Sequence, residues 1–162
     1  MPGEPEFSIR KASSGDVDAI LECLQNSFEA YRDSYTRAAF IDTVLTRETL
    51  RQRLSTMCVF VATSHAGEIV GTVACNVINP GEGHVRGMAV RPEWHGAGLA
   101  SQLLRSVEAE LFSRKCSLVS LDTTTPLQRA TRFYEKHGYW RSGKVTDFFG
   151  MELFEYVKEL GV

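Results

Sequence analysis

The feature that most constrains the fold is an abrupt change of pattern in the middle of the chain. Residues 84–90 end a series of strand-like segments, and residues 98–115 then follow the period of an amphipathic helix. The sequence Gly96-Ala97-Gly98 lies between them, and residues 117–121 form a short apolar run typical of a buried strand. Strand, glycine loop, helix and strand in this order predict a parallel crossover unit. The apolar helix face consists of Leu99, Leu103, Leu104, Val107 and Leu111.

The segments before this unit predict further helices and antiparallel strands. A capping sequence at residues 13–16 precedes apolar residues at helical spacing up to Phe28, so we expect a helix there. Thr46 is a candidate cap for a second short helix, whereas residues 31–36 show no clear period. Strands are expected at residues 7–10, 58–62 and 69–77, the last two joined as a hairpin.

One more helix and a hairpin are predicted after the unit. Thr125 is a candidate N-cap, Pro126 would occupy the first helical position, and Gln128 stands three residues after the cap. Gly138 is expected to end this helix. The loosely alternating apolar residues of segment 139–160 favour a closing hairpin.

The composition is that of one globular domain over residues 1–162, with 43% hydrophobic and 23% charged residues. The formal net charge of −2 argues against a surface that binds nucleic acid. The four cysteines are scattered without a C-x-x-C pair, so we expect no metal site. No apolar run is long enough to span a bilayer, and residues 1–6 do not resemble a signal peptide. We therefore expect a cytoplasmic protein without membrane attachment.

The glycine loop is a candidate phosphate-binding site. Glycines let the backbone approach a ligand, and the free N–H groups at the start of a helix attract an anion. One alternative is that the glycines only turn the chain. A second is a dinucleotide site, for which Asp122 stands about 20 residues beyond the loop, but Ser101 replaces the third glycine and residues 92–94 separate strand from loop. A P-loop is excluded because no Gly-Lys-Ser/Thr follows.

Residues 88–100 and 130–139 carry the most specific motifs. The first reads MAVRPEWHGAGLA and the second ATRFYEKHGY, with a helix and a strand between them. The first resembles the acetyl-CoA motif, and the second the Ala-x-x-(Leu/Phe)-Tyr-Glu-Lys-x-Gly-Phe signature, of the GCN5-related N-acetyltransferase (GNAT) superfamily. The resemblance implies a mixed α+β GNAT fold. Its central, mostly antiparallel sheet would have six to seven strands, splay at the acyl-CoA site and be flanked by about four helices.

The resemblance implies acetyl-CoA as the acyl-donor cosubstrate. The pantetheine arm would lie in the splay, bonded to the backbone near Met88, Ala89 and Val90. Where the family usually has Arg or Gln, this chain has His95, a weaker permanent charge, and Leu127 stands where an Asn is common. The pyrophosphate would lie on the backbone N–H groups of His95, Gly96, Ala97, Gly98, Leu99, Ala100 and Ser101.

The resemblance also implies an N-acetyltransferase that acts directly, in a ternary complex, on a primary amine of a small molecule or peptide. Such a reaction needs a neutral amine, a polarised carbonyl and a proton for the departing thiolate. By resemblance, Tyr134 is the candidate proton donor and the Val90 backbone N–H would polarise the carbonyl. Tyr134 could instead be a core aromatic beside Phe133. His84 is the candidate base, with Glu82 as a second choice and a solvated strand-end histidine as the alternative.

In the family, the acceptor pocket is built from the first helical segments and the final hairpin. Arg86 would favour an anionic group such as a carboxylate if it faces this pocket. A rival function is a non-catalytic acyl-CoA-binding or sensor domain of the same fold, which would not need a proton donor at Tyr134. A homodimer is suggested by analogy alone. Candidate pocket residues are Phe28, Tyr31, Asp33, Tyr35, Lys144, Asp147 and Phe148.

Overall fold

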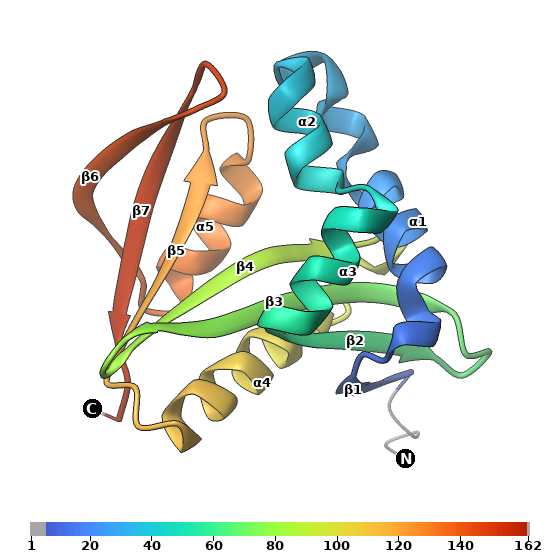
Figure 1. Ribbon diagram of the computed structural model, residues 1–162, viewed down its shortest axis with the longest axis horizontal. Helices are drawn as coiled ribbons and strands as arrows, with labels where there is room; N and C mark the ends of the chain where they lie inside the picture. Colours follow the sequence, from blue (N-terminus) through green and yellow to red (C-terminus); the bar gives the residue numbers. More distant parts are fainter. Residues whose placement is uncertain (1–5, 162) are drawn as a thin grey trace.

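The chain folds around one seven-stranded sheet with the strand order β1-β2-β3-β4-β5-β7-β6 (Figure 1). The computed structural model describes residues 6–161. All neighbouring strands pair antiparallel except β4 and β5, which are parallel. The mixed, mostly antiparallel sheet expected from the sequence is confirmed. The strands are β1 (Phe7–Lys11), β2 (Cys58–Ser64), β3 (Ile69–Asn79), β4 (Glu82–Val90), β5 (Leu118–Thr124), β6 (Trp140–Phe148) and β7 (Met151–Glu159).

Five α-helices cover the sheet, one more than the number expected. Helices α1 to α3 pack over β2, β3 and β4, whereas α4 packs against the first four strands within a separate apolar cluster (Figure 1). Ile20, Leu24 and Leu50 are buried in the first cluster, and Leu103 and Val107 in the second. The helices are α1 (Val17–Phe28), α2 (Arg37–Val44), α3 (Arg47–Thr56), α4 (Leu99–Ser113) and α5 (Gln128–Lys136), with short 3-10 helices η1 (Ser14–Asp16), η2 (Glu29–Ser34) and η3 (Pro92–Trp94).

The segment without a clear sequence period folds as η2 followed by α2. Thr36 caps α2, because its Oγ1 accepts a hydrogen bond from the Ala39 N–H at 3.2 Å. Only Ala39, Phe40 and Val44 of α2 are buried, which is too few for a readable apolar stripe.

The predicted start of α5 is wrong by two residues. The helix begins at Gln128, not at Pro126, and Thr125 does not cap it. Strand β5 continues to Thr124, whose carbonyl accepts a hydrogen bond from the Leu127 N–H at 3.1 Å. Residues 125–126 therefore form a turn before the helix begins.

Strands β4 and β5 part soon after they begin. They pair only at Glu82↔Leu118, Gly83↔Val119 and His84↔Ser120, although β4 continues to Val90 and β5 to Thr124. Figure 1 shows the two strands diverging from this common end. Beyond His84, the edge of β4 that faces β5 is therefore without a strand partner.

The open end of the parted strands is bridged by two hydrogen bonds. The hydroxyls of Tyr35 and Thr124 lie 2.6 Å apart, which joins the segment after η2 to the end of β5. The Thr36 hydroxyl donates to the Phe149 carbonyl at 2.8 Å, which joins the start of α2 to the turn between β6 and β7. These bonds hold the helical segment and the final hairpin on opposite sides of the gap.

Within residues 6–161, no helix is long and apolar enough to cross a membrane. The same residues contain no group of three or more His, Cys, Asp or Glu side chains placed to hold a metal ion. The four cysteines, Cys23, Cys58, Cys75 and Cys116, are free thiols.

The contact between α4 and β4 generates a stability prediction at Gly83. A Cβ at residue 83 would lie 2.6 Å from Leu111 Cδ2 and 3.0 Å from Leu111 Cγ, and the Leu111 side chain is fully buried. We expect Gly83→Ala to lower the free energy of unfolding by about 1–3 kcal/mol, measured by urea denaturation, because it overpacks the core. Gly15→Ala is the control, since its Cβ would lie 3.9 Å from the nearest atom. Equal midpoints for both variants would contradict the prediction.

Candidate active site

A cavity of about 760 Å³ occupies the space between the parted strands β4 and β5. It reaches from the α4 and α5 side of the sheet to the side covered by α1, α2 and α3. Ala97, Asp33, Lys144 and Asp147 are not among its lining residues. The predicted site residues that line it are Tyr134, His84, Met88, Ala89, Val90, His95, Gly96, Gly98, Leu99, Ala100, Ser101, Phe28, Tyr31, Tyr35, Arg86 and Phe148.

The loop after β4 presents a row of free backbone donors to this cavity. Gly96 and Gly98 have φ values of +83° and +81°, the left-handed region that favours glycine, and a Cβ on either would meet no atom within 4 Å. Among the described residues, none of the N–H groups of residues 96–101 donates a hydrogen bond. Free N–H groups at the start of α4 are the donors that bind phosphate. The lack of side chains at Gly96 and Gly98 and the free N–H groups of residues 96–101 together suit the binding of a pyrophosphate.

Backbone groups at the end of β4 also face the gap. The Arg91 N–H donates to the Val70 carbonyl on β3, so the Val90 N–H, one residue earlier, points to the opposite edge. His95 Nε2 lies 3.2 Å from the Val90 carbonyl oxygen on that side. The His95 ring therefore contacts the end of β4. The His95 backbone N–H, which was expected to bind the pyrophosphate, donates instead to the Pro92 carbonyl at 3.1 Å, so the free donors begin at Gly96.

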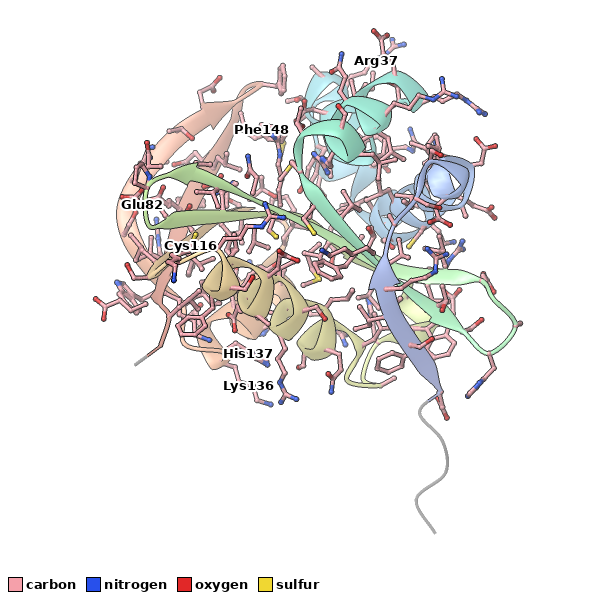
Figure 2. The ribbon with its side chains drawn as sticks, turned by 60° about the horizontal axis from the view of Figure 1, so that its bottom comes forward. Arg37, Glu82, Cys116, Lys136, His137 and Phe148 are labelled. Carbon is pink, nitrogen blue, oxygen red and sulfur yellow. The ribbon has the colours of Figure 1, made fainter. Side chains whose placement is uncertain are left out.

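Ser101 connects the phosphate loop to α5. Its hydroxyl lies 3.1 Å from His137 Nε2, and His137 Nδ1 lies 2.9 Å from the Phe133 carbonyl oxygen. The carbonyl can only accept, so Nδ1 carries the proton and Nε2 of the neutral ring accepts from Ser101. The start of α4 is thereby fixed against the end of α5, where Figure 2 labels Lys136 and His137.

Three basic side chains on α5 line the cavity and were missed in the sequence. Arg129, Arg132 and Lys136 are exposed and stand at i, i+3 and i+7, so they share one face of the helix. That spacing was the available signal. These residues add positive charge beside the phosphate loop, where His95 stands in place of the family's usual Arg or Gln.

Tyr134 lies on the opposite face of α5, at the boundary between core and cavity. Its ring packs edge-on against Phe133 and Tyr139, with centroids 5.4 and 5.8 Å away. Its hydroxyl makes no hydrogen bond with any residue of the described chain, and Tyr134 lines the cavity. Burial raises the pKa of the phenol, so the hydroxyl remains protonated at neutral pH. Tyr134 therefore packs as a core aromatic, and its protonated hydroxyl has no partner among the described residues and is available to a ligand in the cavity.

His84 lies where β4 and β5 part, between two polar side chains of β5. Its Nδ1 is 2.8 Å from Ser120 Oγ, and its Nε2 is 3.6 Å from Asp122 Oδ2. Burial lowers the pKa of His84, and the Asp122 carboxylate opposes this shift. Burial raises the pKa of Asp122, again opposed by its partner. The neutral imidazole that results can accept a proton at pH 7.

The side of the cavity covered by α1 and η2 is aromatic. Phe28, Tyr31 and Tyr35 line it together with Phe148 of β6, which Figure 2 labels. Asp147 instead lies beside the β6–β7 turn, where its Oδ2 is 3.4 Å from the Gly150 N–H. The predicted contribution of the final hairpin is therefore made by Phe148.

Two arginines face the same side of the cavity, and the sequence pointed to one of them. Arg86 on β4 lies 3.4 Å from Asp42 Oδ2 of α2. Arg53 of α3 also lines the cavity but looked like one of several charged residues on a surface helix. The pKa of Arg53 is lowered to about 10, mainly by burial and then by the neighbouring Arg86, while Asp42 opposes both effects.

Comparison with solved structures places this fold among acetyltransferases. The PaiA N-acetyltransferase of Thermoplasma acidophilum in complex with coenzyme A gives a TM-score of 0.78 at 18% identity, covering 94% of this chain and 98% of that chain. The ribosomal-protein-S18-alanine N-acetyltransferase of Escherichia coli gives a TM-score of 0.76 at 15% identity, covering 96% and 95%. At these identities the likeness shows a shared fold.

Sequence comparison identifies the family. An uncharacterized N-acetyltransferase of Methanocaldococcus jannaschii is 29% identical over 132 residues, which cover 81% of this chain and 76% of that relative. The model of the acetyltransferase (GNAT) family matches residues 18–139, a span that includes the phosphate loop and the second motif. Because this match covers well over half of the chain, the protein belongs to the acetyltransferase (GNAT) family.

Proposed function

We propose that the protein transfers the acetyl group of acetyl-CoA to a primary amine, directly and within a ternary complex. The observation that carries the proposal is the continuity of the cavity through the sheet. The free N–H groups of the loop, the Tyr134 hydroxyl and the His84 imidazole all open into this one space. Donor and acceptor can therefore meet between β4 and β5 without a covalent enzyme intermediate.

The residues around the loop fit coenzyme A. Its pyrophosphate would be held by the N–H groups of residues 96–101, with Arg129, Arg132 and Lys136 supplying positive charge. The unpaired edge of β4 would hold the pantetheine arm through backbone hydrogen bonds. When bound, the cosubstrate supplies a thioester-activated acetyl group. The Val90 N–H, which points into the gap, would donate to the acetyl oxygen.

The two candidate proton-transfer groups lie on different elements that border the gap. His84 on β4 accepts the proton of the amine, and Asp122 stabilises the imidazolium that forms. Tyr134 on α5 donates its proton to the departing thiolate. The pKa shifts support both roles, because burial keeps the imidazole neutral and the phenol protonated before the reaction.

The rival function is an acyl-CoA-binding sensor without turnover. Incubation with acetyl-CoA and a pooled panel of primary amines, followed by measurement of free thiol and of acetylated products, separates the two. We expect thiol release to depend on both the protein and an amine. Tight binding of acetyl-CoA without amine-dependent thiol release would support the sensor.

Gly98→Ala tests the phosphate loop against a matched control. A residue with a Cβ in the left-handed region costs roughly 1–2 kcal/mol. The free loop can relieve this cost by changing conformation, whereas the loop that holds the pyrophosphate cannot, so we expect the dissociation constant of coenzyme A to rise about tenfold. Gly67 in the β2–β3 turn has φ +82° and, like Gly98, an open Cβ position, so Gly67→Ala carries the same strain outside the cavity. Isothermal titration calorimetry should show unchanged affinity for Gly67→Ala. An equal loss of affinity for coenzyme A in both variants would argue against phosphate binding by the loop.

Tyr134→Phe tests the proton donor. We expect kcat to fall about 10²-fold or more, because general acid catalysis typically contributes at least that much, while coenzyme A affinity is retained. Tyr139→Phe is the control, since Tyr139 packs against Tyr134 but its hydroxyl donates to Glu108 Oε2 at 2.7 Å and does not line the cavity. If the kcat of Tyr134→Phe were close to that of Tyr139→Phe, the role of Tyr134 as general acid would be contradicted.

The environment of His84 generates a pH prediction that can be measured without knowing the acceptor. By NMR, His84 should titrate below the ordinary value of 6.5, because burial favours the neutral ring. Asp122→Asn should lower this pKa further, since it removes the charge that stabilises imidazolium, and Arg86→Gln should raise it. His84→Gln assigns the resonance and should lower kcat by about 10²-fold. A midpoint above 6.5 would contradict the buried, neutral base.

A further inference from the structure

The guanidinium of Arg53 lines the cavity, and none of the described residues forms an ion pair with it. The guanidinium is partly buried, yet it forms no ion pair or hydrogen bond within residues 6–161. Arg86 is 3.4 Å from Asp42, so the group of Arg53, Arg86 and Asp42 keeps one net positive charge. Burial lowers the pKa of Arg53 only to about 10, so the side chain remains charged at neutral pH.

A partly buried, unpaired guanidinium is unfavourable unless it has a ligand. Removal of a charge from water costs free energy that an opposite charge must offset. A guanidinium presents its donors in a planar fork that matches the oxygens of carboxylate or phosphate. Arg53 is therefore placed to bind an oxyanion that residues 6–161 do not provide.

The backbone of β4 is shaped to accept this guanidinium. Residue Gly87 has φ +68° at a break in the β3–β4 register, and a Cβ there would lie 2.5 Å from Arg53 Nη1. Only glycine combines that backbone angle with so close an approach. The guanidinium thus lies directly on β4, at the bulge between His84 and Val90.

This location belongs to the acceptor half of the cavity. Gly87 is three residues from His84 and three from Val90, each roughly 10 Å along the strand. The proposed coenzyme phosphates have their own donors at residues 96–101 and on α5, on the other side of the sheet. An anion on Arg53 would therefore be carried by the acceptor, within about 10 Å of its amine.

We propose that Arg53, assisted by Arg86, is the specificity site for the acceptor and binds a carboxylate or phosphate group of a small primary amine. This inference rests on the proposed acetyl transfer and names its substrate class. Arg53 is the specificity-determining residue because none of the described residues pairs with it, and Arg86 adds charge next to it. Amines without an anionic group leave the Arg53 charge uncompensated and bind more weakly.

Matched acceptor pairs test the inference with the full-length protein. Glycine against glycinamide tests a carboxylate, phosphoethanolamine against ethanolamine tests a phosphate, and an acidic tripeptide against its neutral counterpart tests a peptide. We expect thiol release with a kcat/KM at least roughly tenfold higher for a small anionic member than for its neutral partner, mainly through KM. Equal rates within the small pairs, or activity on the tripeptide alone, would overturn the inference while acetyl transfer stands.

Variants of Arg53 and of Arg51, a second arginine on α3, supply the matched control. Arg53→Gln should abolish the preference within pairs, and Arg53→Lys should restore part of it. Arg51→Gln removes an equal charge from the same helix outside the cavity and should preserve the preference. Loss of preference in Arg51→Gln to the same extent would assign the effect to general charge and overturn the site.

A binding measurement keeps the inference testable if no amine reacts. Succinate and inorganic phosphate carry the oxyanion but no amine, and we expect one of them to raise the melting temperature of the coenzyme A-bound protein. Arg53→Gln should lose this shift without a lower melting temperature of its own, since it removes an unpaired charge. No thiol release with any amine would reject acetyl transfer alone, whereas an equal anion shift in Arg53→Gln would reject the oxyanion site.

Discussion

The early parting of β4 and β5 is the constraint on which the rest of the structure depends. Pairing stops at His84↔Ser120, and each strand then continues without the other. An unpaired strand edge inside a protein requires a partner for its polar backbone groups, because buried N–H and C=O groups are rarely left without one. The incomplete ladder thus leaves backbone groups in the gap that a ligand can bind.

The elements around the gap line different parts of the cavity. The glycine loop and α5 concentrate positive potential at one side, and the α1–α3 helices with Phe148 enclose the other. His84 stands at the vertex, where Ser120 and Asp122 of β5 can still reach it. A chain with the same helices but a complete β4–β5 ladder would have no space in which these groups could meet.

The sequence was most informative where local pattern decides the structure. The strands before the loop and helix α4 were predicted correctly, because alternation and a full apolar stripe are strong signals. Helix α2 was missed because only one side of a short helix is buried, and the start of α5 was misplaced because β5 overrides the capping signals of Thr125 and Pro126.

The site residues also divide into those that a local pattern identifies and those that depend on tertiary contacts. The loop residues could be named from their motif, since their role depends on backbone shape. Asp122 was considered only as a ligand of a dinucleotide, and Arg53 was not recognised, because their contacts depend on strand register and on the packing of α3 over Gly87. Contacts of that kind join residues far apart in the chain and leave no local pattern.

The few pairs that join β4 to β5 also have a mechanical consequence. The two parts of the sheet meet at Glu82, Gly83 and His84, and at the far end they are held by the hydroxyls of Tyr35 and Thr36. A ligand in the gap adds backbone contacts to both parts and thus acts as a missing strand. Because such a ligand binds only the folded chain, resistance to unfolding and proteolysis rises with its concentration. The two parts of the sheet are therefore held together most firmly when the gap is occupied.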